Sequence, residues 1–304
     1  MIKKSEVKKL DACKRQVSIE IGKEAVDEKL QMVLEDINKK SKVDGFRPGK
    51  APRYVIENKH GELAKEEAIK DLISDSYQEV LNKESLKPID LPEIFDIELK
   101  EGSLFYKASL EVKPEVGIRD YRHLKIVRKP VKVAEEEIQK AIEYLKTNQG
   151  LDKAAPADDI FAKSLGFPLV KDLEESIRKQ LEMSKEQMAR ADMENQLIEQ
   201  LIKRADLAVP ESAVKKQLEH LWYDTQHRLT MQGMKKEDIE SKAEEFKKEL
   251  KGMAERDIKV FFIFDKIAQL ENIKVDKPEM AFKKVMEFLM KEADWQEGGI
   301  ANGH

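Results

Sequence analysis

The feature that most constrains the fold is a helical repeat of apolar residues that runs through the second half of the chain. Between residues 133 and 291, apolar side chains recur at intervals of three, four and seven, with only short interruptions. That spacing places them on one face of an α-helix, so we expect a series of amphipathic helices. The predicted helices are residues 133–148, 159–165, 169–204, 211–231, two within 235–270 that break near Gly252, and 279–291.

The first 113 residues have a mixed pattern. Val17, Ile19 and Ile21 alternate with polar residues, as in a half-buried strand, whereas residues 25–42 and 63–83 have the period of a helix. Two further strand-like runs follow at 94–99 and 104–112, and the Glu-Gly-Ser sequence between them suits a hairpin turn. We therefore predict a small β-α-α-β-β domain, and the fold class of the whole chain is α+β.

The two parts are joined by an extended connector. Residues 114–130 contain two prolines, one glycine and a short strand-like run at 124–127. We predict an α+β domain at 1–113, a linker with the first helix at 114–150, a short seam at 151–157, and a helical domain with arm-like helices at 158–293. Residues 294–304 contain three glycines and are predicted to be a disordered tail.

Composition limits the possible functions. The 304 residues are enough for two or three domains, and 38% of them are charged, with a net charge of −4. The molecule as a whole is therefore not built to coat nucleic acid or an anionic membrane. The N-terminus lacks the apolar core of a secretory signal, and no apolar stretch approaches 18 residues. A cytoplasmic location is expected.

No catalytic constellation is evident in the sequence. His220 and His227 stand seven residues apart, too far for a zinc pair on one helical turn, and phosphate-binding glycine loops and the GxSxG motif are absent. The single cysteine, Cys13, excludes an intramolecular disulfide framework, and we interpret it as a structural thiol rather than a nucleophile. The sequence predicts a protein that is not an enzyme and needs no cofactor or metal.

The most informative segment connects the first two predicted helices. It lies between Asn38 and Arg53, and we call it the basic loop. It combines six basic residues with a single acid, Asp44, a local net charge of +5 on a chain whose total is negative. Phe46 stands inside it between glycines and prolines, which restrict the loop and lower the entropy cost of docking. Two interpretations remain open at this point. Phe46 is tucked under an ordinary surface loop, or the loop docks on an anionic, ribonucleoprotein partner through an exposed ring and cations.

The loop sequence closely resembles the ribosome-docking signature of bacterial trigger factors. The residues that carry the resemblance are Gly45, Phe46, Arg47, Pro48, Gly49, Lys50, Ala51, Pro52 and Arg53. The order of elements around the loop, the Asp-Asp-Ile-Phe-Ala-Lys run at 158–163 and the Ala-Val-Pro run at 208–210 also resemble this family. The resemblance extends over essentially residues 1–291.

The resemblance implies an ATP-independent chaperone that docks near the exit tunnel of the large ribosomal subunit and shields nascent polypeptides in a helical cradle. Homodimerisation when free is also implied, whereas membrane and DNA are not expected partners. The implied ribosome-binding residues are Gly45, Phe46, Arg47, Pro48, Gly49, Lys50, Pro52 and Arg53, supported by Lys39, Lys40 and Lys42.

One departure from the family pattern affects activity. Trigger factors usually carry an FKBP-like prolyl isomerase domain of about 100 residues, an ordinary domain size, between the linker helix and the helical domain. Here only residues 151–157 separate the two. The isomerase activity of the family is therefore not expected in this chain.

Methionines are the candidates for client contact. Nine of the eleven lie from Met183 onward, and flexible thioethers fit many apolar segments. Those off the main helical stripes, such as Met193 and Met234, are expected to be exposed, although methionines that merely fill gaps between helices are an alternative. Residues 258–264 are apolar almost all round and are assigned to the core. The candidate client-binding residues are Met193, Met231, Met234, Met286 and Met290.

Three other functions compete with a ribosome-docked chaperone. A ribosome-independent dimeric holdase or assembly chaperone would keep the cradle and lose the docking. A peptidyl-prolyl cis-trans isomerase would need a proline pocket for which this length leaves no room. An RNA-binding module would bind free RNA with a steep salt dependence and without preference for ribosomes.

Overall fold

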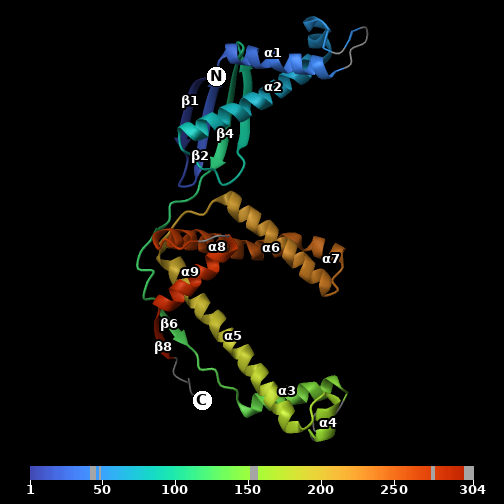
Figure 1. The fold of residues 1–304 in the computed structure, drawn as a ribbon, viewed down its shortest axis with the longest axis vertical. Coiled ribbons are helices and arrows are strands. Elements are labelled where there is room, and N and C mark those ends of the chain that lie inside the picture. The colour runs from blue at the N-terminus through green and yellow to red at the C-terminus, as the bar shows by residue number, and fades with distance from the viewer. Residues whose placement is uncertain (42–45, 48, 151–156, 275–277, 298–304) are drawn as a thin grey trace. The chain divides into compact units, whose positions relative to one another are not determined.

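The computed structural model describes residues 1–41, 46–47, 49–150, 157–274 and 278–297 (Figure 1). The chain divides into two compact units, each made from two separate stretches. Unit 1 contains Met1–Val116 and Leu207–Phe262, and unit 2 contains Gly117–Asp206 and Ile263–His304. The predicted division into consecutive domains is therefore too simple, because part of the predicted helical domain packs with the N-terminal stretch.

Unit 1 begins with a four-stranded antiparallel sheet. Strands β1 (Ile2–Lys9), β2 (Lys14–Ile21), β3 (Glu93–Lys100) and β4 (Ser103–Glu111) lie in the order β1-β2-β4-β3. Strand β1 adds to the predicted β-α-α-β-β order. Its many lysines hide the alternation in the sequence, and charged side chains of this kind are common on an edge strand, where they discourage further pairing.

The predicted hairpin between β3 and β4 is confirmed. Glu101 and Gly102 form its two-residue turn, with φ of 51° and 84°. Two consecutive positive φ angles are the mark of a type I′ turn, whose twist matches that of the flanking strands. The turn sets the register in which Leu99 pairs with Leu104.

Helices α1 (Lys23–Lys40) and α2 (Arg53–Lys83) pack against each other and against the sheet. Helix α2 begins ten residues earlier than predicted, because charged residues in its first turns obscure the stripe that Ile56 and Ala64 start. Its first half packs on α1, and its second half covers the sheet, where Val17, Ile21 and Leu104 are fully buried. The end of the α1–α2 hairpin that carries the basic loop points away from the sheet (Figure 1).

One buried polar pair links α2 to the sheet. The hydroxyl groups of Ser76 and Tyr106 lie 2.7 Å apart within this core. Burial raises the pKa of Tyr106 to about 12, so its phenol stays protonated and able to donate. The pair satisfies two polar groups that would otherwise be costly to bury.

The remaining helices of unit 1 are α6 (Glu211–Met231), α7 (Lys236–Ser241) and the first part of α8 (Ala243–Leu270). The predicted break near Gly252 is wrong. The helices separate at Lys242, and Gly252 continues α8, since one glycine costs a helix only about 1 kcal/mol relative to alanine.

The start of α6 is fastened to the N-terminal sheet. Both the backbone N–H and the hydroxyl of Ser212 donate to Glu111 Oε2, at 2.9 and 2.6 Å. The buried Cys13 thiol lies 3.6 Å from the carbonyl oxygen of Ala208, and burial raises its pKa. The prediction of a structural rather than a nucleophilic thiol agrees with this environment.

The predicted core run 258–264 is mostly buried. Phe262 and Phe264 are buried, but the ring of Phe261 is 57% exposed, so the assignment of the whole run to the core is wrong at this position. An apolar run is buried on all faces of a helix only where neighbours pack against every face of that helix. Helix α8 has one face exposed to solvent at Phe261. Tyr223 is exposed, whereas Trp222 is half-buried and stacks on Phe246.

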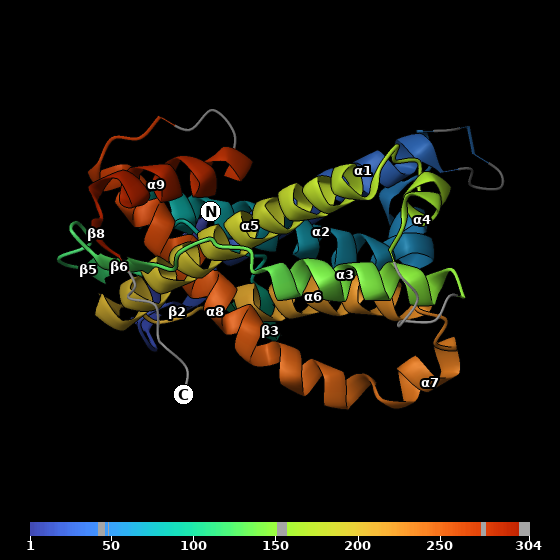
Figure 2. The ribbon, with the colours of Figure 1, turned by 90° about the horizontal axis from the view of Figure 1, so that it is seen from below.

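Unit 2 is built on helices α3 (Glu135–Asn148), α4 (Asp159–Ser164), α5 (Val170–Arg204) and α9 (Pro278–Glu292). Strand β5 (Gly117–Ile118) pairs antiparallel with β7 (Ala205–Asp206), and β6 (Lys125–Arg128) pairs parallel with β8 (Asp294–Glu297). Strands β5, β6 and β8 gather at one end of the unit near α9 (Figure 2). The strand-like run predicted near 124–127 is thus confirmed as β6.

Strand β8 corrects the prediction of a disordered tail. Residues 294–297 are paired, and the Asp294 N–H donates to the carbonyl of Leu124 at 2.9 Å. The partner strand lies about 170 residues earlier in the sequence, so no local pattern could predict this pairing. Residues 298–304 of the predicted tail, and 151–156 of the predicted seam, lie outside the described residues.

Helix α5 buries different faces along its length. Its first half packs through Leu173 and Ile177 on α3 and α4, and its second half buries Met193, Leu197 and Leu201. The apolar repeat of residues 169–204 predicts a single stripe that runs from Leu173 through Met188 to Ile202. This prediction fails in the middle of the helix, where Met188 is 68% exposed. A helix of 35 residues meets different neighbours, and each neighbour selects its own face.

Candidate functional site

The basic loop is held by the two helices that flank it. Ala51 is buried against Val33 and Leu34 of α1 and Ile56 of α2, which fixes the C-terminal side of the loop. Phe46 is 40% exposed although its ring is large and apolar. The interpretation in which Phe46 is tucked beneath the loop is therefore not favoured, and the ring is available to a partner.

A tight turn sets the positions of the two central cations. The backbone N–H of Lys50 donates to the carbonyl of Arg47 at 2.9 Å, and Gly49 has a φ of 78°. A positive φ is a conformation that glycine adopts without steric strain, so Gly49 suits its place in the turn. The first and last residues of such a turn have Cα atoms less than about 7 Å apart, so Arg47 and Lys50 are close neighbours.

The basic residues around the loop differ in their partners. Lys39 pairs with Asp36 at 3.4 Å and Arg53 with Glu57 at 2.6 Å, each within its own helix. Among the described residues, Lys40, Arg47 and Lys50 have no ion-pair partner, and all three are exposed. They are the cations most able to meet an anionic partner. The exposed Pro52 caps the start of α2, and the predicted site residues Lys42, Gly45 and Pro48 lie outside the described residues.

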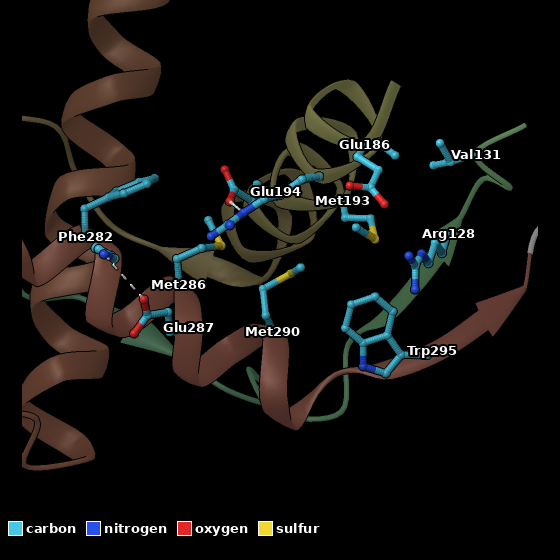
Figure 3. Close-up of a pocket in the computed structure, with 13 residues that line it drawn as sticks. Arg128, Val131, Glu186, Met193, Glu194, Phe282, Met286, Glu287, Met290 and Trp295 are labelled. Carbon is cyan, nitrogen blue, oxygen red and sulfur yellow. Dashed lines mark hydrogen bonds and ion pairs between the residues drawn. The ribbon is translucent and has the colours of Figure 1, made fainter. Parts of the chain in front are cut away.

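Unit 2 contains a groove of about 580 Å³ whose floor is rich in methionine. Met286 and Met290 project from α9 toward Met193 of α5, with Phe282 near one end and Trp295 of β8 near the other (Figure 3). This volume is typical of small-ligand sites, but apolar lining side chains such as Phe282 (44%) and Trp295 (49%) are half exposed. The structure thus leaves an open apolar groove rather than a closed cavity.

Charged residues surround the apolar floor of the groove. Arg190 pairs with Glu194 at 3.0 Å, and Lys283 lies 4.0 Å from Glu287. Exposed pairs of this kind contribute little to stability, but they keep an apolar surface soluble. The arrangement suits weak binding of apolar polypeptide segments, because thioethers adjust to many shapes.

The five predicted client-binding methionines do not all belong to the same unit. Met193, Met286 and Met290 line the groove, whereas Met231 and Met234 belong to unit 1, near the end of α6. Met231 is 78% exposed, but the expected exposure of Met193 is wrong. Met193 is only 7% exposed because it shares the face of Leu197 in the second half of α5.

Phe282 and Trp295 are groove residues that the sequence did not reveal. Phe282 stacks on Phe264 of α8, with ring centroids 4.8 Å apart, which ties α9 to the core. Trp295 lies in the segment that the sequence predicts to be a disordered tail. The sequence signal that marks it is an aromatic side chain close to a methionine-rich helix.

A polar cluster fastens the linker beside α9. Arg122 donates to both carboxylate oxygens of Glu271, and the Tyr121 hydroxyl donates to Glu271 Oε1 at 2.6 Å. The bonds from Arg122 and then from Tyr121 lower the pKa of Glu271. Arg122 also lies over the ring of Phe288, 5.6 Å from its centroid, so the linker and α9 share one anchor.

Comparison with known proteins identifies the family. The family model described as bacterial trigger factor protein matches residues 3–145, and the model of the trigger factor C-terminus matches residues 170–296. The two matched regions together span most of the chain and contain the basic loop and the groove. The chain belongs to the bacterial trigger factor family, which is a family of chaperones.

Curated relatives agree over nearly the full length. The trigger factors of Carboxydothermus hydrogenoformans and Desulforudis audaxviator are each 24% identical, covering 89% and 96% of this chain and 87% and 90% of their own length. The trigger factor of Natranaerobius thermophilus is 34% identical over 139 residues, which are 45% of this chain and 31% of the relative. The first of these alignments is 371 residues long, so about 100 of its positions, an ordinary domain size, have no counterpart in this chain.

A solved structure shares the fold. It comes from work on promiscuous substrate recognition in the folding and assembly activities of the trigger factor chaperone. It has a TM-score of 0.55 and 18% identity, and the match covers 94% of this chain and 99% of the other. Within the described residues, no helix is both long and apolar enough to cross a membrane.

Proposed function

We propose that this trigger factor docks on the ribosome through its basic loop and shields apolar segments of nascent polypeptides in the methionine groove. The observation that carries the proposal is the loop itself. The exposed Phe46 stands beside a turn that brings Arg47 and Lys50 close together, and neither cation has an ion-pair partner among the described residues. Phosphates or acidic side chains near the exit tunnel would meet Arg47 and Lys50, and Phe46 would enter an apolar crevice or stack on a base.

The groove supplies the second half of the activity. Its methionines and aromatic rings offer adaptable apolar contacts, and its charged rim keeps the empty site soluble. Docking raises the local concentration of the groove around an emerging chain, so weak and rapidly reversible contacts are sufficient. No covalent step is involved, the cycle needs no ATP, and the cytoplasm is its expected location.

We further propose that the chain lacks prolyl isomerase activity. Residues 146–169, between the two matched family regions, are too few for a folded isomerase domain. Turnover of a proline-containing test peptide should therefore stay at the uncatalysed rate. Catalysis above that rate would contradict this proposal without affecting the docking.

The decisive experiment is co-sedimentation with purified bacterial ribosomes. The parent chain should pellet with ribosomes at modest salt, and the triple variant Phe46→Ala, Arg47→Ala, Lys50→Ala should remain in the supernatant. A matched control removes an exposed aromatic ring and two exposed cations elsewhere, through Tyr223→Ala, Lys8→Ala and Lys9→Ala.

The control should pellet like the parent. If neither the parent nor the control pellets, the ribosome-independent dimeric holdase becomes the better function for this chain, and sedimentation velocity of the free protein would test it. If the parent binds free RNA as well as it binds ribosomes, with a steep salt dependence, the RNA-binding alternative is favoured.

A further inference from the structure

Asn38 lies in the last turn of α1, outside the segment 45–53 that resembles the family signature. It makes two hydrogen bonds to the loop. Its backbone carbonyl accepts from the Gly49 N–H at 3.0 Å, and its side-chain Nδ2 donates to the Ala51 carbonyl, also at 3.0 Å. The orientation of the amide follows from this contact, because the Ala51 oxygen can only accept.

These two bonds bracket Lys50. Gly49 and Ala51 are its neighbours in the chain, and both are held by the same residue of α1. The Lys50 N–H in turn closes the turn that begins at Arg47. Asn38 therefore joins α1 to the backbone on both sides of Lys50, through its carbonyl on one side and its side-chain amide on the other.

Burial of the Asn38 side-chain oxygen costs folding free energy, and a useful contact elsewhere in the side chain would offset this cost. Its Oδ1 is buried and has no partner among the described residues, an arrangement that folded proteins rarely keep without a reason. Alanine would be the better helix former at this position and would bury no polar atom. Retaining the amide is explained if its Nδ2 bond to the loop is needed.

We propose that Asn38 is the positioning residue of the docking loop, holding the Arg47–Lys50 turn in the orientation that meets an anionic partner. This inference rests on the docking function proposed above. Asn38 itself need not touch the ribosome. It limits the motion of the turn before binding, so less entropy is lost when the cations engage.

The test compares Asn38→Ala and Asn38→Asp with the parent in a ribosome-binding titration at several salt concentrations. Both substitutions remove the Nδ2 donor, and the second keeps the size of the side chain. We expect about fivefold weaker binding for each, the worth of one hydrogen bond, and a salt slope reduced by about one as one cation loses its contact. Asn38→Gln keeps an amide and should recover part of the affinity.

The matched control is Gln31→Ala, an exposed amide on the same helix whose side chain bonds only within α1, to Glu35 at 3.3 Å. It should bind like the parent. The thermal midpoints of Asn38→Ala, Asn38→Gln and Gln31→Ala should stay close to that of the parent, whereas Asn38→Asp buries a carboxylate oxygen and should unfold at a lower temperature. Parent-like binding by Asn38→Ala or Asn38→Asp would overturn the proposal, because the donor would then be unnecessary. For Asn38→Ala, affinity that falls only in proportion to a falling thermal midpoint would also overturn it.

Failure of the docking function gives a different result. If the triple variant of Phe46, Arg47 and Lys50 binds ribosomes like the parent, the loop is not the docking site. If the triple variant loses binding while both Asn38 variants keep it, docking stands and only the positioning role is lost.

Discussion

The basic loop and the methionine groove, the two binding regions that we propose, are built in opposite ways. The loop is a continuous segment whose turn is closed by one local hydrogen bond, from Lys50 to Arg47. The groove is assembled from α5, α9 and β8, and its key side chains are about 100 residues apart in sequence. The loop therefore gains specificity from a restricted backbone and fixed charges, whereas the groove gains breadth from flexible side chains on separate elements.

The difference predicts that damage to one region leaves the other working. A local turn survives when distant packing fails, but a site built from three elements fails when any of them shifts. Four substitutions test this independence and the anchoring of unit 2, and they are ordered from the largest expected effect to the smallest.

Met286→Asp should have the largest effect. Met286 is only 3% exposed on the groove floor, so a carboxylate there lacks a partner and costs about 3 kcal/mol or more of unfolding free energy. Urea unfolding followed by tryptophan fluorescence measures the loss, and binding of an apolar peptide should disappear. Ribosome binding should persist.

The matched control for that change is Met231→Asp, at a site that is 78% exposed, where the free energy should change by less than about 0.5 kcal/mol. Equal loss of ribosome binding and peptide binding in Met286→Asp would show that the two regions are not independent.

Gly49→Ala tests the loop in the same way. A Cβ at this position would meet only Lys39 Cα, at 3.9 Å, so the cost is the positive φ of 78° rather than a clash. That strain is worth about 1–2 kcal/mol, which corresponds to roughly tenfold weaker ribosome binding in a titration. Peptide binding in the groove should not change.

Gly61→Ala provides its control. This glycine lies inside α2, its backbone is helical, and nothing stands within 4 Å of the added Cβ. The substitution should leave ribosome binding unchanged and stabilise the helix by up to about 1 kcal/mol. Similar behaviour of the two glycine variants would mean that the turn geometry does not matter for docking.

Met290→Ser examines the breadth of the groove. Met290 is half-buried, so the loss of its thioether removes about 1 kcal/mol of apolar contact and weakens peptide binding several-fold. Fluorescence anisotropy of a labelled apolar peptide measures the change. Met183→Ser, on an exposed part of α5 outside the groove, should bind like the parent. Parent-like binding by Met290→Ser would place the client site elsewhere.

Acid should weaken unit 2 slightly through Glu271. Its pKa is lowered in the folded chain, first by Arg122 and then by Tyr121. A group of this kind stabilises the fold above its ordinary pKa of 4.5, and the stabilisation is lost as the pH falls through the lowered value. The parent should therefore lose more unfolding free energy than Glu271→Gln between about pH 6.5 and about pH 3.5.

Glu66→Gln, at an exposed position of α2 in unit 1, is the reference for that measurement and should follow the parent. An identical pH dependence of the parent and Glu271→Gln would mean that the linker anchor contributes nothing to stability. Because the arginine is half exposed, this effect should be the smallest of the four.

Much of the fold could be predicted from short-range patterns. The alternation around Val17 correctly predicted a strand, and the Glu101-Gly102 pair correctly predicted a hairpin. Most helices in the second half begin and end within a few residues of their predicted limits. These elements follow from bonds and stripes within a few turns of chain. Prediction failed where the deciding partner was distant, as at Met193 and β8.

By itself, the sequence determined the basic loop that we propose for docking. Its cations, its ring and the glycine of its turn all lie between residues 39 and 53, where backbone preferences and charge spacing act locally. Only the tertiary structure decided the groove and the contacts of Asn38. Burial and side-chain hydrogen bonds depend on which residues meet in space. The face that α5 buries, the pairing of β8 and the contact from Asn38 to Ala51 were therefore fixed when the elements packed together.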